Sequence, residues 1–358
     1  MFIEVKYRKN GKSGSPFSAV GREKQRIISK VAMFYLIAHG YRELPPCRFD
    51  VVGIDGENIH WIKNAFDFFS LKDWSHKMKI KWYKDKQLMN VNQKNKVTWL
   101  TYPAFEKFPG IVHGFSTRLG GVSQGIYESM NLSFTRGDEE SAVRENYRRL
   151  SAAMGFSMED IVTSDQTHTT NVRVVTEEDR GNGITKPRPY TDVDGMITNV
   201  PGLVLATFYA DCVPLFFIDP VHRAVGLSHS GWRGTVGKIG KVTVEKMTEE
   251  FQTDPSELYA AIGPSICQDC YEVSEDVIDQ FREAFEEKYW DVLFYRKPDG
   301  KYQLNLWEAN RRIFLDAGIK EERISMPGIC TCCNPLFLYS HRASHGKRGN
   351  LGAFITVR

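Results

Sequence analysis

Two short apolar runs constrain the fold more than any other part of the sequence: GLVLATFYA at residues 202–210 and VPLFFI at residues 213–218. Both are far shorter than the roughly 20 residues that a helix needs to cross a bilayer. Runs of this length between turn residues are typical of strands buried in a sheet. Strands are also predicted at residues 171–176, 195–200 and 223–229, and helices at residues 234–251, 275–290 and 305–318. The alternation of strands and helices indicates a mixed α/β class.

The first 96 residues have a different character. A strand at residues 1–5, a helix at 19–40 and a strand at 48–55 predict a small α/β unit. The Lys-rich stretch that follows reads as a linker or an edge hairpin. We therefore predict three parts, with boundaries at residues 1–70, 71–96 and 97–358.

The charge of the chain is uneven. Residues 1–95 hold 18 Lys and Arg against 9 Asp and Glu, whereas the whole chain has a net charge of only +3. A basic end can favour a polyanion, but Lys-rich surfaces are usually just solvated, so a nucleic-acid partner is not expected. No signal peptide is recognisable at the N-terminus, so we expect a cytoplasmic protein without a membrane partner.

Three side chains able to bind a metal stand at the ends of predicted strands: His168, Cys212 and His229. Two imidazoles and one thiolate are the three protein ligands that a catalytic zinc uses, with one position left open. The spacing of the three residues alone does not distinguish a metal site from ordinary buried, hydrogen-bonded side chains. A second interpretation makes Cys212 a nucleophile with His229 as its base, which predicts a cysteine hydrolase or deamidase.

The motif HSGWRG places Trp232 and Arg233 between glycines. Glycine permits close approach of the backbone to a ligand, and a helix starting near Thr235 together with Arg233 would favour an anion such as phosphate. The alternative is a strand-to-helix turn with Trp232 in the core and Arg233 in a salt bridge.

Seven cysteines without a secretion signal argue against structural disulfides. Cys267 and Cys270 are two residues apart, but the gap of about 60 residues to the next cysteines is irregular. We identified no second Cys-X-X-Cys pair, so we predict small buried residues or free thiols rather than a second zinc site. The other cysteines concerned are Cys330, Cys332 and Cys333.

A resemblance adds to this reading. Eight blocks follow one another in the order HGFSTRLGGVSQGIYESMNLSF, RGDEESAVRENYRRL, SDQTHTTNV, DVDGMITN, YADCVPLFFID, HSGWRG, AIGPSICQDCYEV and YSHRASHGKRG. Together they make residues 97–358 similar to the YfiH/YlmD family, bacterial relatives of the laccase-domain protein FAMIN. The resemblance implies a layered mixed-sheet α/β fold (CNF1/YfiH-type).

The resemblance also implies an activity. Members of the family are described as purine nucleoside enzymes, which phosphorolyse adenosine, inosine and methylthioadenosine to the free base and a (methylthio)ribose 1-phosphate and which deaminate adenosine. It implies zinc, with copper possible at the same site, held by His168, Cys212 and His229. Purine nucleosides and phosphate are the expected partners.

Further roles are predicted from the matching blocks. Arg233 and Arg118 are candidates for a phosphate clamp, and Asp211 and His113 are candidates for proton handling or base contact. Gln166 and Trp232 are predicted to contact substrate. Arg348 is the candidate to replace an arginine that many relatives carry in a Thr-Gly-Arg sequence.

The older description of such proteins as copper-dependent polyphenol oxidases is disfavoured. Four coppers need about ten histidines, several of them in His-X-His pairs. This chain has nine histidines and no such pair.

Residues 1–70 resemble the YraN/UPF0102 family, whose fold is of the restriction-endonuclease type. Glu4 and Lys6 match the E-X-K half of the nuclease motif. The acidic residues that the family places upstream have no counterpart, so we expect a truncated α/β segment that does not cleave DNA.

Overall fold

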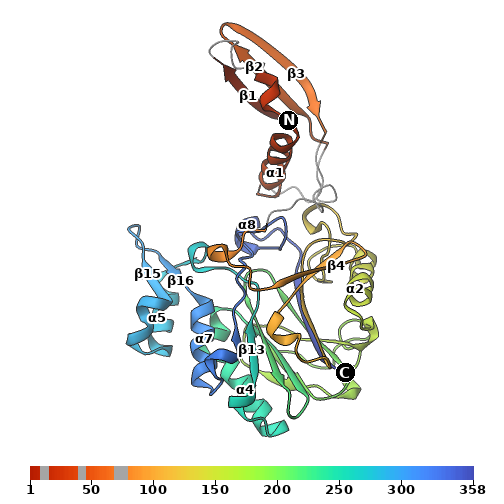
Figure 1. The fold of residues 1–358 in the computed structure, drawn as a ribbon, viewed down its shortest axis with the longest axis vertical. Helices are drawn as coiled ribbons and strands as arrows, with labels where there is room; N and C mark the ends of the chain where they lie inside the picture. Colours follow the sequence, from red (N-terminus) through yellow and green to blue (C-terminus); the bar gives the residue numbers. More distant parts are fainter. Residues whose placement is uncertain (9–15, 39–45, 68–79) are drawn as a thin grey trace.

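The computed structural model describes residues 1–8, 16–38, 46–67 and 80–358. Two six-stranded sheets form the centre of residues 80–358 (Figure 1). The first sheet has the order β4 (Asn90–Lys94), β5 (Val97–Thr101), β6 (Ile111–Ser116), β18 (Leu351–Val357), β10 (Val204–Tyr209) and β7 (Ile161–Thr163). The second has the order β17 (Ile324–Ser325), β13 (Tyr259–Ile262), β11 (Val213–Asp219), β12 (Ala224–Ser230), β9 (Gly195–Thr198) and β8 (Val172–Val174).

Both sheets are mixed, since three pairs of strands within them are parallel: β7 with β10, β8 with β9, and β13 with β17. Side chains from the two inner faces form one core, in which Phe216 and Ile218 of β11 meet Phe115, Leu205 and Ile355 of the first sheet. The outward-facing residues of β11, which include Leu215 and Phe217, pack against helices instead. Every residue of β11 is therefore buried, which explains an unbroken apolar run in place of alternation.

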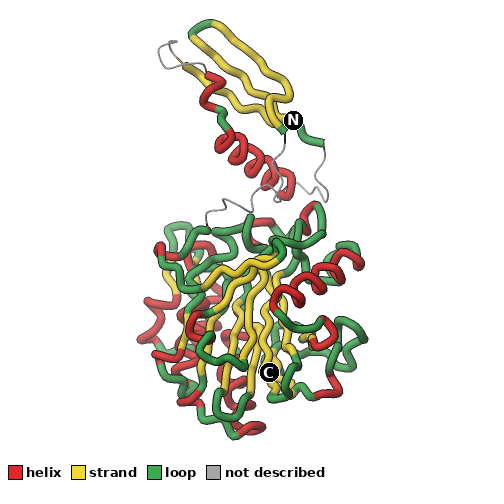
Figure 2. Tube along the Cα trace, turned by 45° about the vertical axis from the view of Figure 1, so that its right-hand side comes forward, coloured by secondary structure: helices red, strands yellow, loops and turns green. Residues whose placement is uncertain are grey.

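Helices cover both outer faces (Figures 1 and 2). The helix α2 (Glu140–Met154) packs on the first sheet, and α4 (Ile239–Phe251) and α7 (Leu306–Asp316) pack on the second. The helix α5 (Glu275–Ala284) belongs to the same apolar core but lies against β16 and α3. The predicted layered, mixed-sheet α/β class is confirmed. Shorter elements complete the domain: α3 (Trp232–Val236), α6 (Trp290–Leu293), α8 (His341–Ser344) and the small sheet of β14 (Glu272–Val273), β16 (Tyr302–Leu304) and β15 (Phe294–Arg296).

Two predicted helices are shorter than expected. The helix predicted at residues 234–251 is divided into α3 and α4 because Lys238 has a left-handed backbone, with φ of 57°. The helix predicted at 275–290 ends at Ala284, where Phe285 turns to an extended conformation and buries its ring in the core. In both cases tertiary packing overrides local helix propensity.

Residues 71–96 are predicted to be a linker or an edge hairpin. Residues 71–79 lie outside the described residues, and residues 80–96 contact the large domain. The amide N–H of Lys81 donates to Asn334 Oδ1 (2.7 Å), and that of Tyr83 donates to the carbonyl of Gly328 (2.7 Å). The strand β4 then pairs with β5 as the edge hairpin of the first sheet. We propose on this basis that the large domain includes residues 80–96.

Within the described ranges, the N-terminal unit contains a three-stranded sheet, the 3-10 turn η2 (Pro16–Ala19) and the helix α1 (Arg22–Ala38). In this sheet β1 (Phe2–Arg8) is parallel to β2 (Phe49–Asp55), which is antiparallel to β3 (Asn58–Phe66). The strand β3 was not predicted, because its apolar residues are interspersed irregularly with polar ones and most of it is exposed. None of the helices in the described part of the chain is long and apolar enough to cross a membrane.

Candidate metal centre and active-site cavity

The chain passes from the first sheet to the second after β7 and again after β10, and each crossing carries a candidate metal ligand. His168 lies between β7 and β8, and Cys212 lies between β10 and β11. The third ligand, His229, is in β12, where the strand register pairs it with Pro214 of β11. The ligand atoms of these three residues lie within 4.8 Å of one another, so the structure brings the predicted set together.

The three side chains form an open group. Cys212 Sγ lies 4.0 Å from His168 Nε2, and the ring centroids of His168 and His229 are 4.9 Å apart. His229 is buried, whereas His168 is exposed. Three protein ligands facing a cavity are typical of a catalytic rather than a structural zinc, and thiolate with imidazole suits zinc or Cu(I).

Asp194 orients both histidines, and the sequence did not reveal this role. Its Oδ1 lies 2.7 Å from His229 Nδ1, which leaves His229 Nε2 free to bind a metal. Its Oδ2 accepts hydrogen bonds from the amide N–H groups of Thr167 (2.9 Å) and Thr169 (3.0 Å), the residues on either side of His168. One carboxylate therefore fixes the tautomer of one ligand and the loop of the other.

The same contacts set the charge of the site. Burial would raise the pKa of Cys212, but the neighbouring His229 and His168 outweigh burial and lower the pKa of this thiol to about 6. Burial would lower the pKa of His229, but Cys212 and Asp194 raise the pKa of this imidazole to about 9. Without a metal, the pair is thus a thiolate and an imidazolium at neutral pH.

Gly231 leaves space for the metal ligands. A Cβ atom at this position would lie 2.8 Å from His168 Cδ2 and 3.3 Å from Cys212 Sγ. Both contacts are too close, although the φ of −70° would suit any residue. The glycine that opens GWRG is therefore needed for space beside the ligands rather than for backbone freedom.

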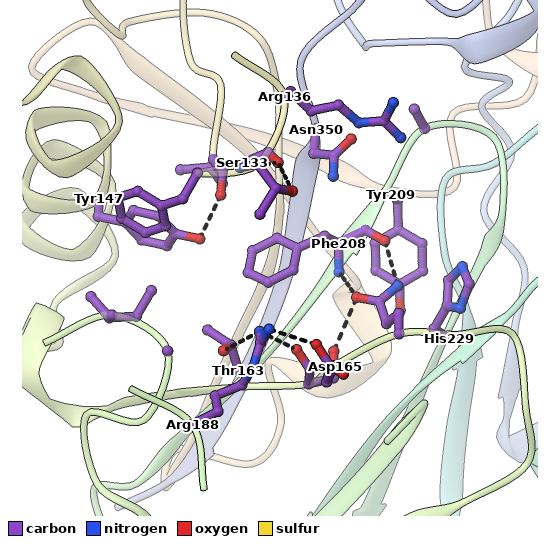
Figure 3. A pocket seen from close by; sticks show the side chains of 18 of the residues that line it. Ser133, Arg136, Tyr147, Thr163, Asp165, Arg188, Phe208, Tyr209, His229 and Asn350 are labelled. Carbon is purple, nitrogen blue, oxygen red and sulfur yellow. Dashed lines mark hydrogen bonds and ion pairs between the residues drawn. The ribbon is translucent and has the colours of Figure 1, made fainter. Parts of the chain in front are cut away.

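The three ligands line a cavity of about 740 Å³, which Figure 3 shows from close by. Most of the remaining wall is supplied by residues 132–136, 163–166, 183–188 and 208–210, together with Arg348 and Asn350. The aromatic ring of Phe208 projects into the middle of this space (Figure 3). The volume is sufficient for a nucleoside-sized ligand.

Arginines that carry no counter-charge lie on the cavity wall. Arg136 and Arg348 form no ion pair with any carboxylate in the part of the chain that the structure describes, and the buried Nε of Arg348 has no hydrogen-bond partner. Burial and the charge of Arg136 lower the pKa of Arg348 to about 10. Two neighbouring cations with an unused donor favour a bound anion.

Gln166 lies on the cavity wall, but its amide is engaged by the backbone. Its Oε1 accepts from the N–H of Phe208 (2.7 Å) and its Nε2 donates to the carbonyl of Phe208 (2.8 Å). The side chain therefore holds Phe208 in place and keeps one N–H for a ligand.

Two other predicted ligand contacts lie in the core, outside the cavity. Arg118 donates to the carbonyls of Glu128 (2.8 Å) and Pro335 (2.6 Å). His113 Nε2 accepts from the N–H of Tyr102 (2.8 Å), and burial lowers the pKa of this imidazole to about 3. Their glycine-punctuated sequence predicted a ligand loop, but the structure gives both residues internal partners.

The remaining candidates also face away from the cavity. Arg233 is exposed and stacks on the ring of Trp232 at 4.3 Å, and Trp232 packs against the core around α4 and α7. The helix α3 that follows has only five residues, so it offers no extended N-terminal anion site. Asp211 accepts from Thr331 Oγ1 (2.6 Å) and from the N–H of Arg342 (2.7 Å).

Comparison with known proteins identifies the large domain. Residues 112–358 match the family model described as multi-copper polyphenol oxidoreductase laccase. The chain is 39% identical over 249 residues to purine nucleoside phosphorylase YlmD of Bacillus subtilis, covering 69% of this chain and 89% of the relative. The chain belongs to this YlmD/YfiH family.

Two further members of the YlmD/YfiH family extend the comparison. Adenosine deaminase RL5, from an unknown prokaryotic organism, is 34% identical over 64% of this chain and 88% of its own length. The crystal structure of YlmD from Geobacillus stearothermophilus superimposes with a TM-score of 0.69 and 36% identity, covering 75% of this chain and 98% of that one. The relatives' names identify the YlmD/YfiH family as a family of enzymes.

Residues 1–54 match a second model, that of the uncharacterised protein family UPF0102. In this unit the carboxylate of Glu4 binds Lys6 at 3.0 Å and Lys24 at 3.1 Å. The matched E-X-K residues are therefore paired with each other.

We expect Asp194→Asn to weaken zinc binding by about 10- to 100-fold, because His229 loses the acceptor that fixes its tautomer. The measurement is zinc affinity by competition with a chromogenic chelator. Asp192→Asn is the matched control, since Asp192 accepts hydrogen bonds from Thr167 and Asn171 of the His168 loop but forms none with His229. Equal affinities of the two variants would contradict the role of Asp194.

In the metal-depleted protein, alkylation of Cys212 should reach half its maximal rate near pH 6, because the thiol loses its proton there. The rate should rise from pH 5 to 7 and level off above. Mass spectrometry of the peptide that contains Cys212 measures the rate of alkylation, and added zinc should lower that rate. A midpoint above pH 8, as for an ordinary thiol, would refute the thiolate–imidazolium pair.

Proposed function

We propose that this protein is a metal-dependent purine nucleoside phosphorylase that also deaminates adenosine. One observation carries the proposal: an open His168–Cys212–His229 group lines the same cavity as Arg348, whose Nε has no hydrogen-bond partner. The names of the relatives supply the substrate class, and adenosine, inosine and methylthioadenosine are the proposed nucleosides. We also place this activity in the cytoplasm.

Different residues of the cavity are proposed to bind the phosphate and the purine. Arg136 and Arg348 bind the phosphate, replacing Arg233 and Arg118 as the predicted clamp. The ring of Phe208, held by Gln166, supports the purine. A phosphate oxygen then forms a bond to C1′ while the bond from C1′ to the purine nitrogen breaks, and the nitrogen takes up a proton from dihydrogen phosphate.

The donor set of His168, Cys212 and His229 fits zinc, with copper as a possible substitute. When bound, zinc supplies Lewis acidity and lowers the pKa of a water toward neutrality, the chemistry that deamination at C6 of adenine uses. Asp194 keeps His229 Nε2 available, and Gly231 leaves the space beside His168 free.

A copper-dependent polyphenol oxidase remains disfavoured. In the described ranges the histidines contribute to a single three-ligand group, so four coppers lack ligands. The thiolate–imidazolium pair of Cys212 and His229 does support the second candidate, a cysteine hydrolase or deamidase.

Incubation of the zinc-loaded protein with adenosine and phosphate should yield adenine and ribose 1-phosphate, and incubation without phosphate should release ammonia. Chromatography and an ammonia assay measure the two products. Cys212→Ser should lose the zinc of the cavity and both activities together, because the thiolate of Cys212 is proposed as a ligand of that metal. A Cys212→Ser variant that keeps as much zinc as the wild type, with a covalent acyl adduct trapped on wild-type Cys212, would favour the hydrolase instead.

Arg348→Gln should raise the KM for phosphate about tenfold or more, because one charge-assisted hydrogen bond contributes about 1.5–3 kcal/mol. Arg233→Gln is the matched control and should leave this KM unchanged, since Arg233 is exposed outside the cavity. Steady-state kinetics at saturating nucleoside measure both values. The reverse pattern would restore Arg233 as the clamp.

A further inference from the structure

A second group of cysteines converges in the large domain. The Sγ atoms of Cys267, Cys270, Cys330 and Cys333 lie within 4.8 Å of one another, and none is in a disulfide. We had predicted separate buried or free thiols. That prediction overlooked that Cys330 and Cys333 are themselves a Cys-X-X-Cys pair, the partner that Cys267 and Cys270 lacked.

The dimensions of the group suit a tetrahedral metal. With metal–sulfur bonds of about 2.3 Å, the four sulfurs of a zinc tetrathiolate lie about 3.8 Å from one another. Cys270 Sγ and Cys333 Sγ are 3.5 Å apart, and no pair exceeds 4.8 Å. Shifts of about 1 Å or less would therefore bring all four sulfurs to bonding distance.

The backbone holds the two pairs in register. The N–H of Thr331 donates to the carbonyl of Ser265 (3.1 Å), which places the two loops side by side. The N–H groups of Cys267 (3.2 Å) and Cys333 (3.4 Å) both donate to Cys330 Sγ. Amide donors aimed at sulfur stabilise a thiolate, as the ligand of a metal requires.

Two of the four cysteines are buried, whereas Cys270 and Cys333 are partly exposed. Cys267 and Cys330 are each 1% exposed and belong to the apolar core that also contains Trp307. Tyr83, whose ring packs edge-on against Trp307 at 5.1 Å, lies against the same core. Four thiolates would repel one another there unless a cation compensated their charge.

We propose that Cys267, Cys270, Cys330 and Cys333 bind a structural zinc ion, distinct from the metal of the cavity. Four protein ligands leave no open position, so this second zinc stabilises the fold and takes no part in chemistry. Its binding replaces the thiol protons, which are released to solvent. The proposal does not depend on the proposed enzymatic activity.

The proposed structural zinc also stabilises the turn at Asp211, which carries the cavity residue Cys212. Thr331, which lies between the ligands Cys330 and Cys333, donates its Oγ1 to Asp211. The guanidinium of Arg342 binds the carbonyl of Cys270 (3.0 Å), and the N–H of Arg342 donates to the other Asp211 oxygen. Asp211 directly precedes Cys212 and has a left-handed φ of 91°, so these contacts hold the turn that presents Cys212.

Metal analysis of the full chain, purified without chelator, tests the proposal. We expect two zinc ions per chain in the wild type and one in a Cys267→Ser/Cys330→Ser variant. His168→Ala/His229→Ala should also retain one, since it removes only the cavity site. Cys332→Ser is the matched control and should retain two, because Cys332 neighbours the four ligands without belonging to them. One zinc in the wild type, unchanged in Cys267→Ser/Cys330→Ser, would overturn the proposal.

A second measurement applies if the cysteine variants fail to fold. The His168→Ala/His229→Ala variant keeps all four thiols and can be loaded with Co²⁺. We expect sulfur-to-cobalt charge-transfer bands and the intense visible bands of a tetrahedral tetrathiolate. Their absence, or a denatured mass reduced by the hydrogens of two disulfides in the freshly purified protein, would show that these cysteines do not hold a metal.

Discussion

The hydrogen bonds of the Asp194 carboxylate are the contacts on which the candidate centre depends. A neutral histidine binds a metal only through the ring nitrogen that carries no proton. A hydrogen bond that holds the proton on the other nitrogen therefore keeps the ligand nitrogen available. Asp194 fixes His229 through one oxygen and the loop of His168 through the other. Its own position is secured from β12, because the N–H of His229 donates to the carbonyl of Asp194 (2.7 Å). His229 and Asp194 are thus joined by two hydrogen bonds, one between their side chains and one between their backbones.

The packing of the two sheets makes this arrangement possible. Asp194 precedes β9, which pairs with β12, so the strand register brings a carboxylate and an imidazole 35 residues apart into contact. The carboxylate is fully buried and would be costly there alone. Two amide donors and one imidazole compensate it, and although burial would raise the pKa of Asp194, these bonds lower it to about 2. The carboxyl of Asp194 is therefore ionised at neutral pH.

The sequence predicted the class of fold and the three candidate metal ligands that the structure brings together, because apolar runs and matching blocks are local signals. It did not predict Asp194, although this residue stands in a quoted block, since its role exists only through contacts between distant segments. His113 and Arg118 show the opposite error: a glycine-punctuated loop is typical of ligand contact, but their partners are backbone groups of the core. The second Cys-X-X-Cys pair, Cys330 and Cys333, is visible in the sequence. Only the folded chain shows that it lies next to Cys267 and Cys270.

The placement of His168 and Cys212 at the two crossings between sheets has a mechanical consequence. Any metal bound there joins the two layers of the domain, in addition to whatever chemistry it supplies. Because such an ion binds the folded chain and not the separated layers, each increase in free metal above the dissociation constant adds to the free energy of unfolding. If His168, Cys212 and His229 bind a metal, the stability of the packing between the two sheets depends on the concentration of free metal, and the metal-free domain is less stable than the metal-bound one.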